Sequence, residues 1–344
     1  MDFSDKRRQQ FLGERQYLNA LESFEEVVYG ADGLVDNLRK DDDPPGWHKN
    51  LAHGIASERF DLLLMHYTGG DPIEPMRAEL EQVVHAYEQY APYLWKYLDD
   101  RNEPVFKFYS LDEYCQLMQL IGLCFLLHRR DLLPRLVFLQ DGVSAIGQVG
   151  QGNGGTDWLY EEFMSAGLGA DTRYEADTLS FGNPYSALAD AMSSSDNVAA
   201  LSDLHQYLKN WYKALAGCGW HDAHKPDPKN GSQAGYYGYW SFEAGAAVIL
   251  LGIDDDTSLH KYLYYPKDLV AWCRANAALG APADERSPRL RCLAGQPCPR
   301  TGYWFTPAAA GSRQHFDAGQ TMPDLASSDG ASGWATVWQW DEQQ

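Results

Sequence analysis

The chain has 344 residues, of which 44% are hydrophobic and 22% are charged, as in soluble globular proteins. This length suits one large domain or two ordinary ones. Its 28 Lys and Arg against 48 Asp and Glu give a formal net charge of −20. That balance disfavours binding to nucleic acid or to an anionic membrane, because both need clustered basic residues. It favours a basic protein partner, although solubility alone would also explain it.

The N-terminus, the apolar runs and the cysteines together predict a cytoplasmic protein. Residues 2–8 carry charges with no apolar stretch behind them, so we expect no signal peptide. The runs Leu117–Leu127 and Ala244–Ile253 are far shorter than the ~20 residues that span a membrane. The six cysteines are scattered along the chain, which is typical of a reduced protein without a disulfide framework.

Helical periodicity dominates the N-terminal part. Apolar residues step by four and three from Tyr17 to Leu38, which predicts an amphipathic helix weakened near its end by two glycines. An acidic stretch with two prolines at 41–46 predicts a loop.

A second amphipathic helix is predicted from Met76 to Tyr97. Acidic residues outnumber basic ones along it, so we expect an apolar stripe and an acidic face. Such a face usually serves solvation, and partner binding is the alternative. Its candidate contact residues are Glu79, Glu81 and Glu88.

The next segment predicts a buried helix. Ser110 and Glu113 have the spacing of a capping box, and the residues that follow are apolar nearly all round up to Leu127. A further helix is expected from Asp131, with Pro134 tolerated in its first turn.

A stretch rich in Gly, Gln and Asn at 148–157 predicts a boundary between two helical parts. Shorter helices are expected beyond it at Trp158–Met164, Tyr185–Met192, Val198–Leu215, Ser241–Leu251 and Pro266–Ala277. The tail differs in character, and its aromatic and β-branched run Trp334–Asp341 predicts a short strand. We therefore predict a mainly α protein with helical domains at 1–147 and 156–280 and a Pro/Gly-rich tail at 281–344.

Three residues have a spacing that could serve metal chemistry. Cys218, His221 and His224 could hold a metal in a hydrolase, but no second tight cluster offers a fourth ligand, so polar loop residues are the simpler interpretation. A looser candidate set consists of Cys292, Cys298 and His315.

Two other patterns are expected to be structural. Gly150–Gly155 matches G-x-G-x-x-G, but its flanks are helical, so we interpret it as an inter-domain loop. Glu243 follows Trp240 in an apolar helix, where we expect a hydrogen-bonding role rather than a catalytic one.

An acidic cluster, Asp254, Asp255 and Asp256, follows an apolar helix. The C-terminal end of a helix is its negative end, so this placement is locally unfavourable and can mark function. The carboxylates could pair with Lys and Arg of a basic partner. A solvated turn that caps the next helix is the alternative.

Several segments together resemble a known family. Residues 63–73 resemble the turn that leads into a long helix in the N-terminal domain of that family, and Ser110–Gln140 resembles the next helical pair of that domain. Gly235–Leu269, with its aromatic entry, apolar helix, glycine stop and restart after Tyr-Tyr-Pro, resembles the C-terminal domain of PoNi-type bacterial immunity proteins. Residues 298–340 resemble tails of other immunity proteins of type VI secretion and Rhs-type toxins.

The resemblance implies a helical, non-enzymatic protein that needs no cofactor and binds a cognate toxin encoded by the adjacent gene. The better-known toxins of this group degrade DNA, so the acidic chain is expected to occupy a nuclease's substrate cleft, with carboxylates in place of phosphates. Binding at a distance from the active site is the structural alternative. No nucleic-acid or membrane partner is expected, a homodimer stays open, and a metal-dependent hydrolase or a helical scaffold are the alternative functions. The expected toxin contacts are Asp254, Asp255, Asp256, Glu79, Glu81 and Glu88.

Overall fold

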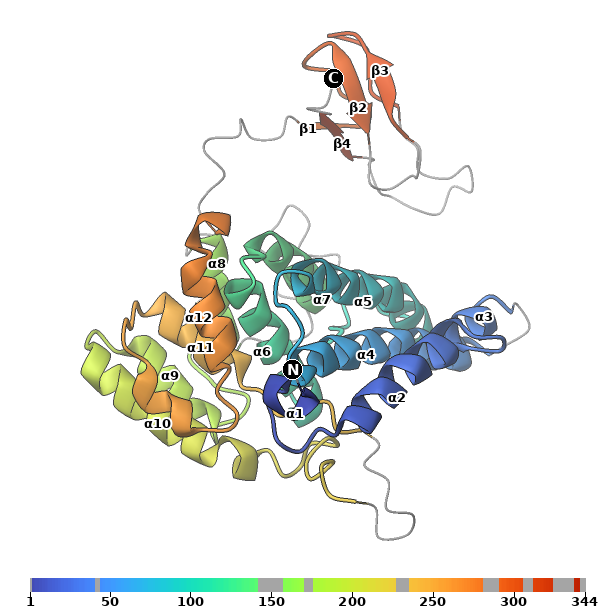
Figure 1. The fold of residues 1–344 in the computed structure, drawn as a ribbon. Helices are drawn as coiled ribbons and strands as arrows, with labels where there is room; N and C mark the ends of the chain where they lie inside the picture. The colour runs from blue at the N-terminus through green and yellow to red at the C-terminus, as the bar shows by residue number, and fades with distance from the viewer. Residues whose placement is uncertain are drawn as a thin grey trace. The chain divides into compact units, whose positions relative to one another are not determined.

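The computed structural model describes residues 2–40, 44–141, 157–169, 176–226, 235–280, 291–305, 312–323 and 337–340. It divides into two compact units, Met1–Gly280 and Ala281–Gln344. Helices build the first unit, and a small antiparallel sheet builds the second (Figure 1). The mainly α fold predicted from the sequence is confirmed.

The predicted helix from Tyr17 to Leu38 is not continuous. It consists of α2 (Glu14–Phe24), a π-helical turn η1 (Glu25–Tyr29) and α3 (Leu34–Leu38), after a short α1 (Phe3–Lys6). Gly30 ends the π turn in an extended conformation, with ψ 170°, so the chain leaves the helix there. Val28 lies on the predicted apolar stripe and is buried, whereas its neighbours Val27 and Tyr29 face solvent.

Two long helices, α4 (Pro45–Gly69) and α5 (Met76–Leu98), lie side by side along their lengths (Figure 1). The predicted loop at 41–46 lies in part outside the described residues, and α4 begins at its second proline. Periodicity did not predict α4, because it buries residues on more than one side against α2, α3 and α5. It ends at Gly70, whose φ of +86° favours glycine.

The helix α6 (Leu111–Leu126) is the centre of the first unit, and its residues from Tyr114 onward are buried as predicted, except Gln116. The predicted capping box is wrong in detail. Ser110 is the N-cap residue but makes no side-chain cap hydrogen bond, and Glu113 accepts from the backbone N–H of Lys107 at 2.8 Å instead. A 3-10 turn η2 (Arg130–Leu132) then leads into α7 (Leu133–Asp141).

The remaining helices of the described residues are α8 (Trp158–Leu168), α9 (Tyr185–Ser193), α10 (Asn197–Ala214), α11 (Phe242–Leu250), η5 (Thr257–Lys261), α12 (Lys267–Ala275) and η6 (Ala277–Leu279). The five α-helices among them follow the predicted positions closely, whereas the two 3-10 turns, η5 and η6, were not predicted. A single hydrophobic core runs from Leu12 to Cys273 and joins both predicted helical parts. The predicted boundary at 148–157 lies almost wholly outside the described residues, so the division into domains 1–147 and 156–280 stays a prediction.

The described residues of the second unit form four short strands, β1 (Arg291–Leu293), β2 (Gly302–Phe305), β3 (Gln314–Phe316) and β4 (Val337–Trp340). Their order is β1-β4-β2-β3, and every neighbouring pair is antiparallel. The predicted strand near the end of the chain corresponds to β4, whereas β1 to β3 were not predicted. This unit has its own small core, which is formed by Cys292, Cys298, Trp304, Phe316, Met322 and Trp338.

Candidate functional site

The acidic face predicted on α5 is largely neutralised within the molecule. Glu88 accepts two hydrogen bonds of 2.7 Å from the Arg135 guanidinium, a bidentate pair. Glu81 lies 3.0 Å from Arg129 and 3.5 Å from Arg135. These two arginines flank η2 and tie α7 to α5, so the carboxylates already have cationic partners.

Glu79, the third predicted contact residue on α5, also has a partner. Its Oε2 lies 2.8 Å from Nδ1 of His66 on α4. Burial alone would lower the pKa of His66, but the hydrogen bond and the charge of Glu79 raise it above its usual value. The pair therefore acts as a cross-link between the two long helices.

The predicted aspartate cluster is split by burial. Asp254 and Asp255 are exposed, and Asp255 accepts hydrogen bonds from the N–H and hydroxyl of Thr257. Asp256 is buried instead, with Arg274 Nη1 at 2.6 Å and the Tyr265 hydroxyl at 2.5 Å. Burial would raise the pKa of Asp256, but these two hydrogen bonds outweigh it and lower that pKa.

The predicted metal candidates are engaged elsewhere. Cys218 is buried, His221 stacks on Tyr212 at 4.1 Å between ring centroids, and His224 Nδ1 lies 2.8 Å from the Tyr239 hydroxyl. Within the described part of the chain, no three His, Cys, Asp or Glu residues are grouped to hold a metal ion. This finding covers the looser set Cys292, Cys298 and His315 as well. Gly150–Gly155 lies outside the described residues.

Glu243 is fully buried on α11 and organises its surroundings. Its Oε1 accepts hydrogen bonds from the Tyr207 hydroxyl at 2.6 Å, Trp211 Nε1 at 3.0 Å and the Ser241 hydroxyl at 2.8 Å. Burial raises the pKa of this carboxyl. The hydrogen-bonding role expected from the sequence fits this network.

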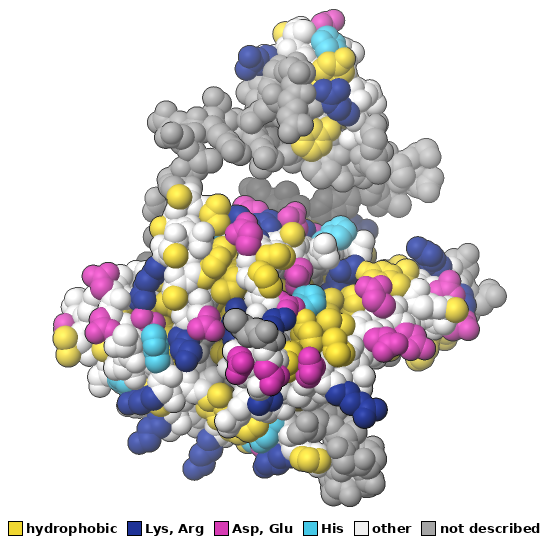
Figure 2. Space-filling view, viewed as in Figure 1, with side chains coloured by type: hydrophobic (Ala, Val, Ile, Leu, Met, Phe, Trp, Pro, Cys, Tyr) yellow, Lys and Arg dark blue, Asp and Glu magenta, His cyan; other side chains and the backbone are white. Residues whose placement is uncertain are grey.

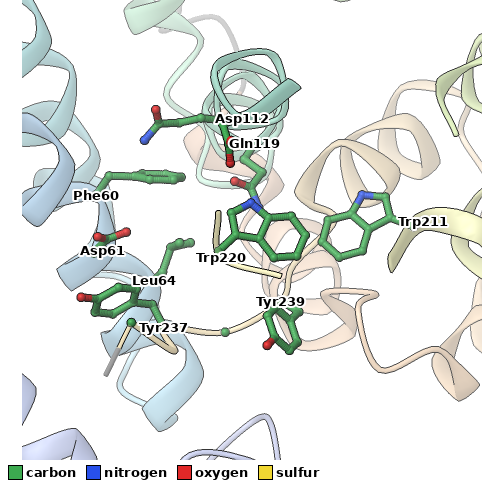
Figure 3. A pocket seen from close by; sticks show the side chains of 12 residues that line it. Phe60, Asp61, Leu64, Asp112, Gln119, Trp211, Trp220, Tyr237 and Tyr239 are labelled. Carbon is green, nitrogen blue, oxygen red and sulfur yellow. The ribbon is translucent and has the colours of Figure 1, made fainter. Parts of the chain in front are cut away.

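A cavity of about 130 Å³ lies where α4, α6 and α10 meet the aromatic segment 235–240. Figure 3 shows its walls: Phe60, Asp61 and Leu64 come from α4, Gln119 from α6, and Trp220 and Tyr239 close the other side. We call it the Asp61 cavity. Trp220 is held from behind by Trp211, whose ring stacks on it at 5.4 Å and 20°. The cavity thus has rigid aromatic and polar walls that come from distant parts of the sequence.

Asp61 is the most unusual residue of this cavity. Among the described residues, no donor or cation contacts its carboxylate. Burial, and then the charge of Glu58 one helical turn away, raise the pKa of Asp61 to about 8. Asp61 and Tyr237 also border a second, smaller hollow that Glu58 lines from α4 and Ser23 from α2. Two carboxyl groups are therefore held close together without a cationic partner from the described residues, and Asp61 is mainly protonated at neutral pH.

Gln119 contributes a second acceptor to the Asp61 cavity. Its side chain is 6% exposed, and its Nε2 donates to the backbone oxygen of Trp240 at 2.8 Å. This bond fixes the amide so that Oε1 is left for the cavity, and it has no hydrogen-bond partner among the described residues. Asp112 adds a third wall group, with one oxygen bound to the Gly219 N–H at 2.8 Å.

An exposed surface on α2 and η1 borders the smaller hollow, and the sequence analysis missed it. Glu22, Glu25 and Glu26 are exposed there and make no ion pair with the described residues. Figure 2 shows acidic side chains gathered along this part of the molecule. Leu18 and Tyr29 lie on the same two elements, 56% and 45% exposed. A sign of this surface in the sequence is Leu18, an apolar residue that lies near several glutamates and outside the apolar stripe of the predicted helix.

The chain matches a known protein family over part of its length. Residues 155–269 match the family model described as PoNe immunity proteins (PoNi), C-terminal. Over these residues the chain is therefore similar to the C-terminal domain of these immunity proteins. The resemblance predicted from the sequence is confirmed over these residues, which include α8 to α11 and the start of α12. The PoNi family implies an immunity protein against a polymorphic toxin.

Among solved structures, the chain is similar to protein PA2201 from Pseudomonas aeruginosa, with a TM-score of 0.53 and 20% identity. The match covers 76% of this chain and 87% of that chain, so the two share a fold. Comparison with curated proteins found no match. In the parts of the chain that the structure describes, every helix is too short or too polar to cross a membrane.

Proposed function

We propose that this protein binds a cognate antibacterial toxin and neutralises it. The observation that carries this proposal is the PoNi match over residues 155–269. Those residues build helices that share one core with the N-terminal helices, so the matched segment is an integral part of the first unit. The proposed role is inhibition by binding, without chemistry on a substrate.

We further propose that the toxin is a nuclease whose basic cleft receives acidic side chains of this protein. A nuclease must present basic groups to the phosphate backbone of its substrate. A chain with a net charge of −20 is complementary to such a cleft and would be steered toward it. Electrostatic steering makes the association rate fall as salt rises, because exposed charges are screened over about 8 Å at physiological ionic strength.

Several of the expected contact residues form ion pairs within the molecule. Ion pairs join Glu79 to His66, Glu81 to Arg129, Glu88 to Arg135 and Asp256 to Arg274. These four carboxylates therefore already have partners within the molecule. Asp254 and Asp255 remain exposed and stay in the proposal. The exposed glutamates of α2 and η1, Glu22, Glu25 and Glu26, join them as a second candidate contact surface.

Growth rescue tests the proposal. Bacteria expressing the toxin domain encoded beside this gene are grown with and without this protein, and we expect rescue together with a co-purifying complex. Absence of rescue by a folded protein against a demonstrably active toxin would reject the pairing.

Kinetics then test the contact surfaces. With catalytically inactivated toxin, we expect the combined change of Glu22, Glu25 and Glu26 to Gln, or of Asp254 and Asp255 to Asn, to slow association about tenfold at low salt. Asp190→Asn, which removes an exposed charge on α9, is the matched control. A surface whose neutralisation leaves the association rate and its salt dependence unchanged lies outside the interface.

A further inference from the structure

We propose that the Asp61 cavity receives one arginine side chain of the bound toxin. The identity of the partner rests on the proposed function, whereas the chemistry of the occupant follows from the cavity itself.

The size of the cavity selects a side chain. Sites for cofactors and drug-sized ligands usually enclose about 300–1,000 Å³. The Asp61 cavity has about 130 Å³, which is too small for such molecules and large enough for the end of one long side chain. It is accessible from outside, since Asp112 on its rim is exposed and Asp61, Trp220 and Tyr237 are only half-buried.

The polar groups of the cavity select a donor with a positive charge. The carboxyl group of Asp61 and Oε1 of Gln119 make no hydrogen bond with the described residues. Asp112 offers a further carboxylate oxygen, because the Gly219 N–H occupies only the other one. Burial disfavours the ionised form of Asp61 as long as no cation lies beside it. A cationic donor could bond all three groups and would stabilise the ionised form of Asp61.

The aromatic walls select arginine over lysine. The Trp220 ring lies between the cavity and Trp211, which fixes its plane by stacking (Figure 3). A guanidinium is flat, stacks on such rings and carries five N–H donors in a fork that can reach acceptors on different walls. An ammonium has three donors on a compact head and is more strongly hydrated, so it would match the slot less well.

The test uses N-acetyl-arginine amide as the probe and the full-length protein labelled with 5-fluorotryptophan. The fluorine resonance of Trp220 is assigned with Trp220→Phe. We expect the probe to shift this resonance in a saturable way with a Kd on the order of millimolar. N-acetyl-citrulline amide, which has the same shape without the charge, should cause no saturable shift, and the lysine analogue should bind at least threefold more weakly.

Asp61→Asn should weaken probe binding at least tenfold, whereas Asp190→Asn should leave it unchanged. Because Asn removes a carboxyl group that has no cationic partner among the described residues and keeps the side chain's shape, the Asp61→Asn variant should unfold at the same or a higher denaturant concentration. The same variant should bind inactivated toxin at least tenfold more weakly.

Three results would overturn the inference: no saturable shift with the arginine probe, an equal shift with the citrulline analogue, or unchanged binding in Asp61→Asn. Rescue of growth by the wild-type protein without probe binding would reject the arginine site and leave the proposed function standing. Probe binding that depends on Asp61, without growth rescue, would reject the proposed function and leave the cavity's preference for arginine standing.

Discussion

Single buried carboxyl groups have large effects in this molecule, and Glu243 is the clearest case. Its Oε1 accepts from Tyr207, Trp211 and Ser241. Glu243→Ala removes the acceptor of three buried donors and leaves a void, so we expect the free energy of unfolding to fall by about 3–5 kcal/mol. Urea denaturation measures this loss, and Glu243→Gln, which keeps one acceptor oxygen, should lose about 1 kcal/mol. An alanine variant as stable as the wild type would contradict this role.

The raised pKa of Glu243 gives a second prediction at the residue scale. Burial places the pKa in the folded state above the value of about 4.3 that the unfolded chain has. The folded state therefore binds this proton more tightly, and the free energy of unfolding should increase as pH falls through the folded pKa. Glu243→Gln should lack this contribution, so the stability difference between wild type and variant should change with pH. A constant difference from pH 4 to 8 would argue against a buried titrating group.

At the scale of elements, α6 and α11 pack closely against each other. A Cβ atom added to Gly122 would lie 2.5 Å from the backbone carbon of Phe242 and 2.6 Å from the backbone nitrogen of Glu243. Neither backbone atom can move without shifting a helix, so we expect Gly122→Ala to cost about 3 kcal/mol or more in chemical denaturation. Gly54→Ala is the matched helical control: its nearest neighbour is a flexible Leu34 methyl group at 3.3 Å, and it should be neutral or slightly stabilising.

The contact between α4 and α5 gives a pH-dependent prediction. The pKa of His66 is raised in the folded state by Glu79, so the protonated pair stabilises the fold below the unfolded value near 6.5. This stabilisation, about 1 kcal/mol, should be lost as pH rises through the folded pKa. Glu79→Gln should lower the His66 pKa in an NMR titration and flatten the dependence of stability on pH. An unchanged His66 titration in that variant would show that Glu79 is not its partner.

Elements with one apolar stripe could be predicted from the sequence, and those shaped by several neighbours could not. The stepping from Met76 to Tyr97 gives α5 closely, whereas α4 buries more than one side and shows no single stripe. Strands of three or four residues, such as β1 and β3, are too short to show alternation. Only the β-branched and aromatic run containing β4 gave a signal in the tail.

The candidate site was harder to predict, because tertiary packing assembles it. Asp61, Gln119 and Trp220 lie far apart in the sequence and meet only where α4, α6 and the aromatic segment pack together. Burial also differs between adjacent residues for reasons that the spacing of residues in the sequence does not reveal. Asp256 is buried because Arg274, on α12, reaches its carboxylate, whereas Asp255 is exposed.

At the scale of the whole molecule, each compact unit has its own core, and the PoNi match lies entirely within the first. We therefore expect a fragment of residues 1–280 to unfold cooperatively at the midpoint shown by the helical signal of the full chain. Trp338 is fully buried in the small core of the second unit, so Trp338→Ala in the full chain should disrupt that unit and leave the helical transition unchanged. A shift of the helical midpoint in either variant would mean that the two units stabilise each other.

The same fragment tests which unit carries the proposed protection. Every candidate contact residue, on α2, on η1, after α11 and around Asp61, lies before Gly280. We therefore expect residues 1–280 to rescue growth and to bind inactivated toxin within about threefold of the full chain. Trp338→Ala serves as the full-length comparison, since it perturbs the second unit without shortening the chain. If the fragment folds but loses protection, the interface must include residues of the tail. If Trp338→Ala then loses protection too, the tail must be folded in order to act.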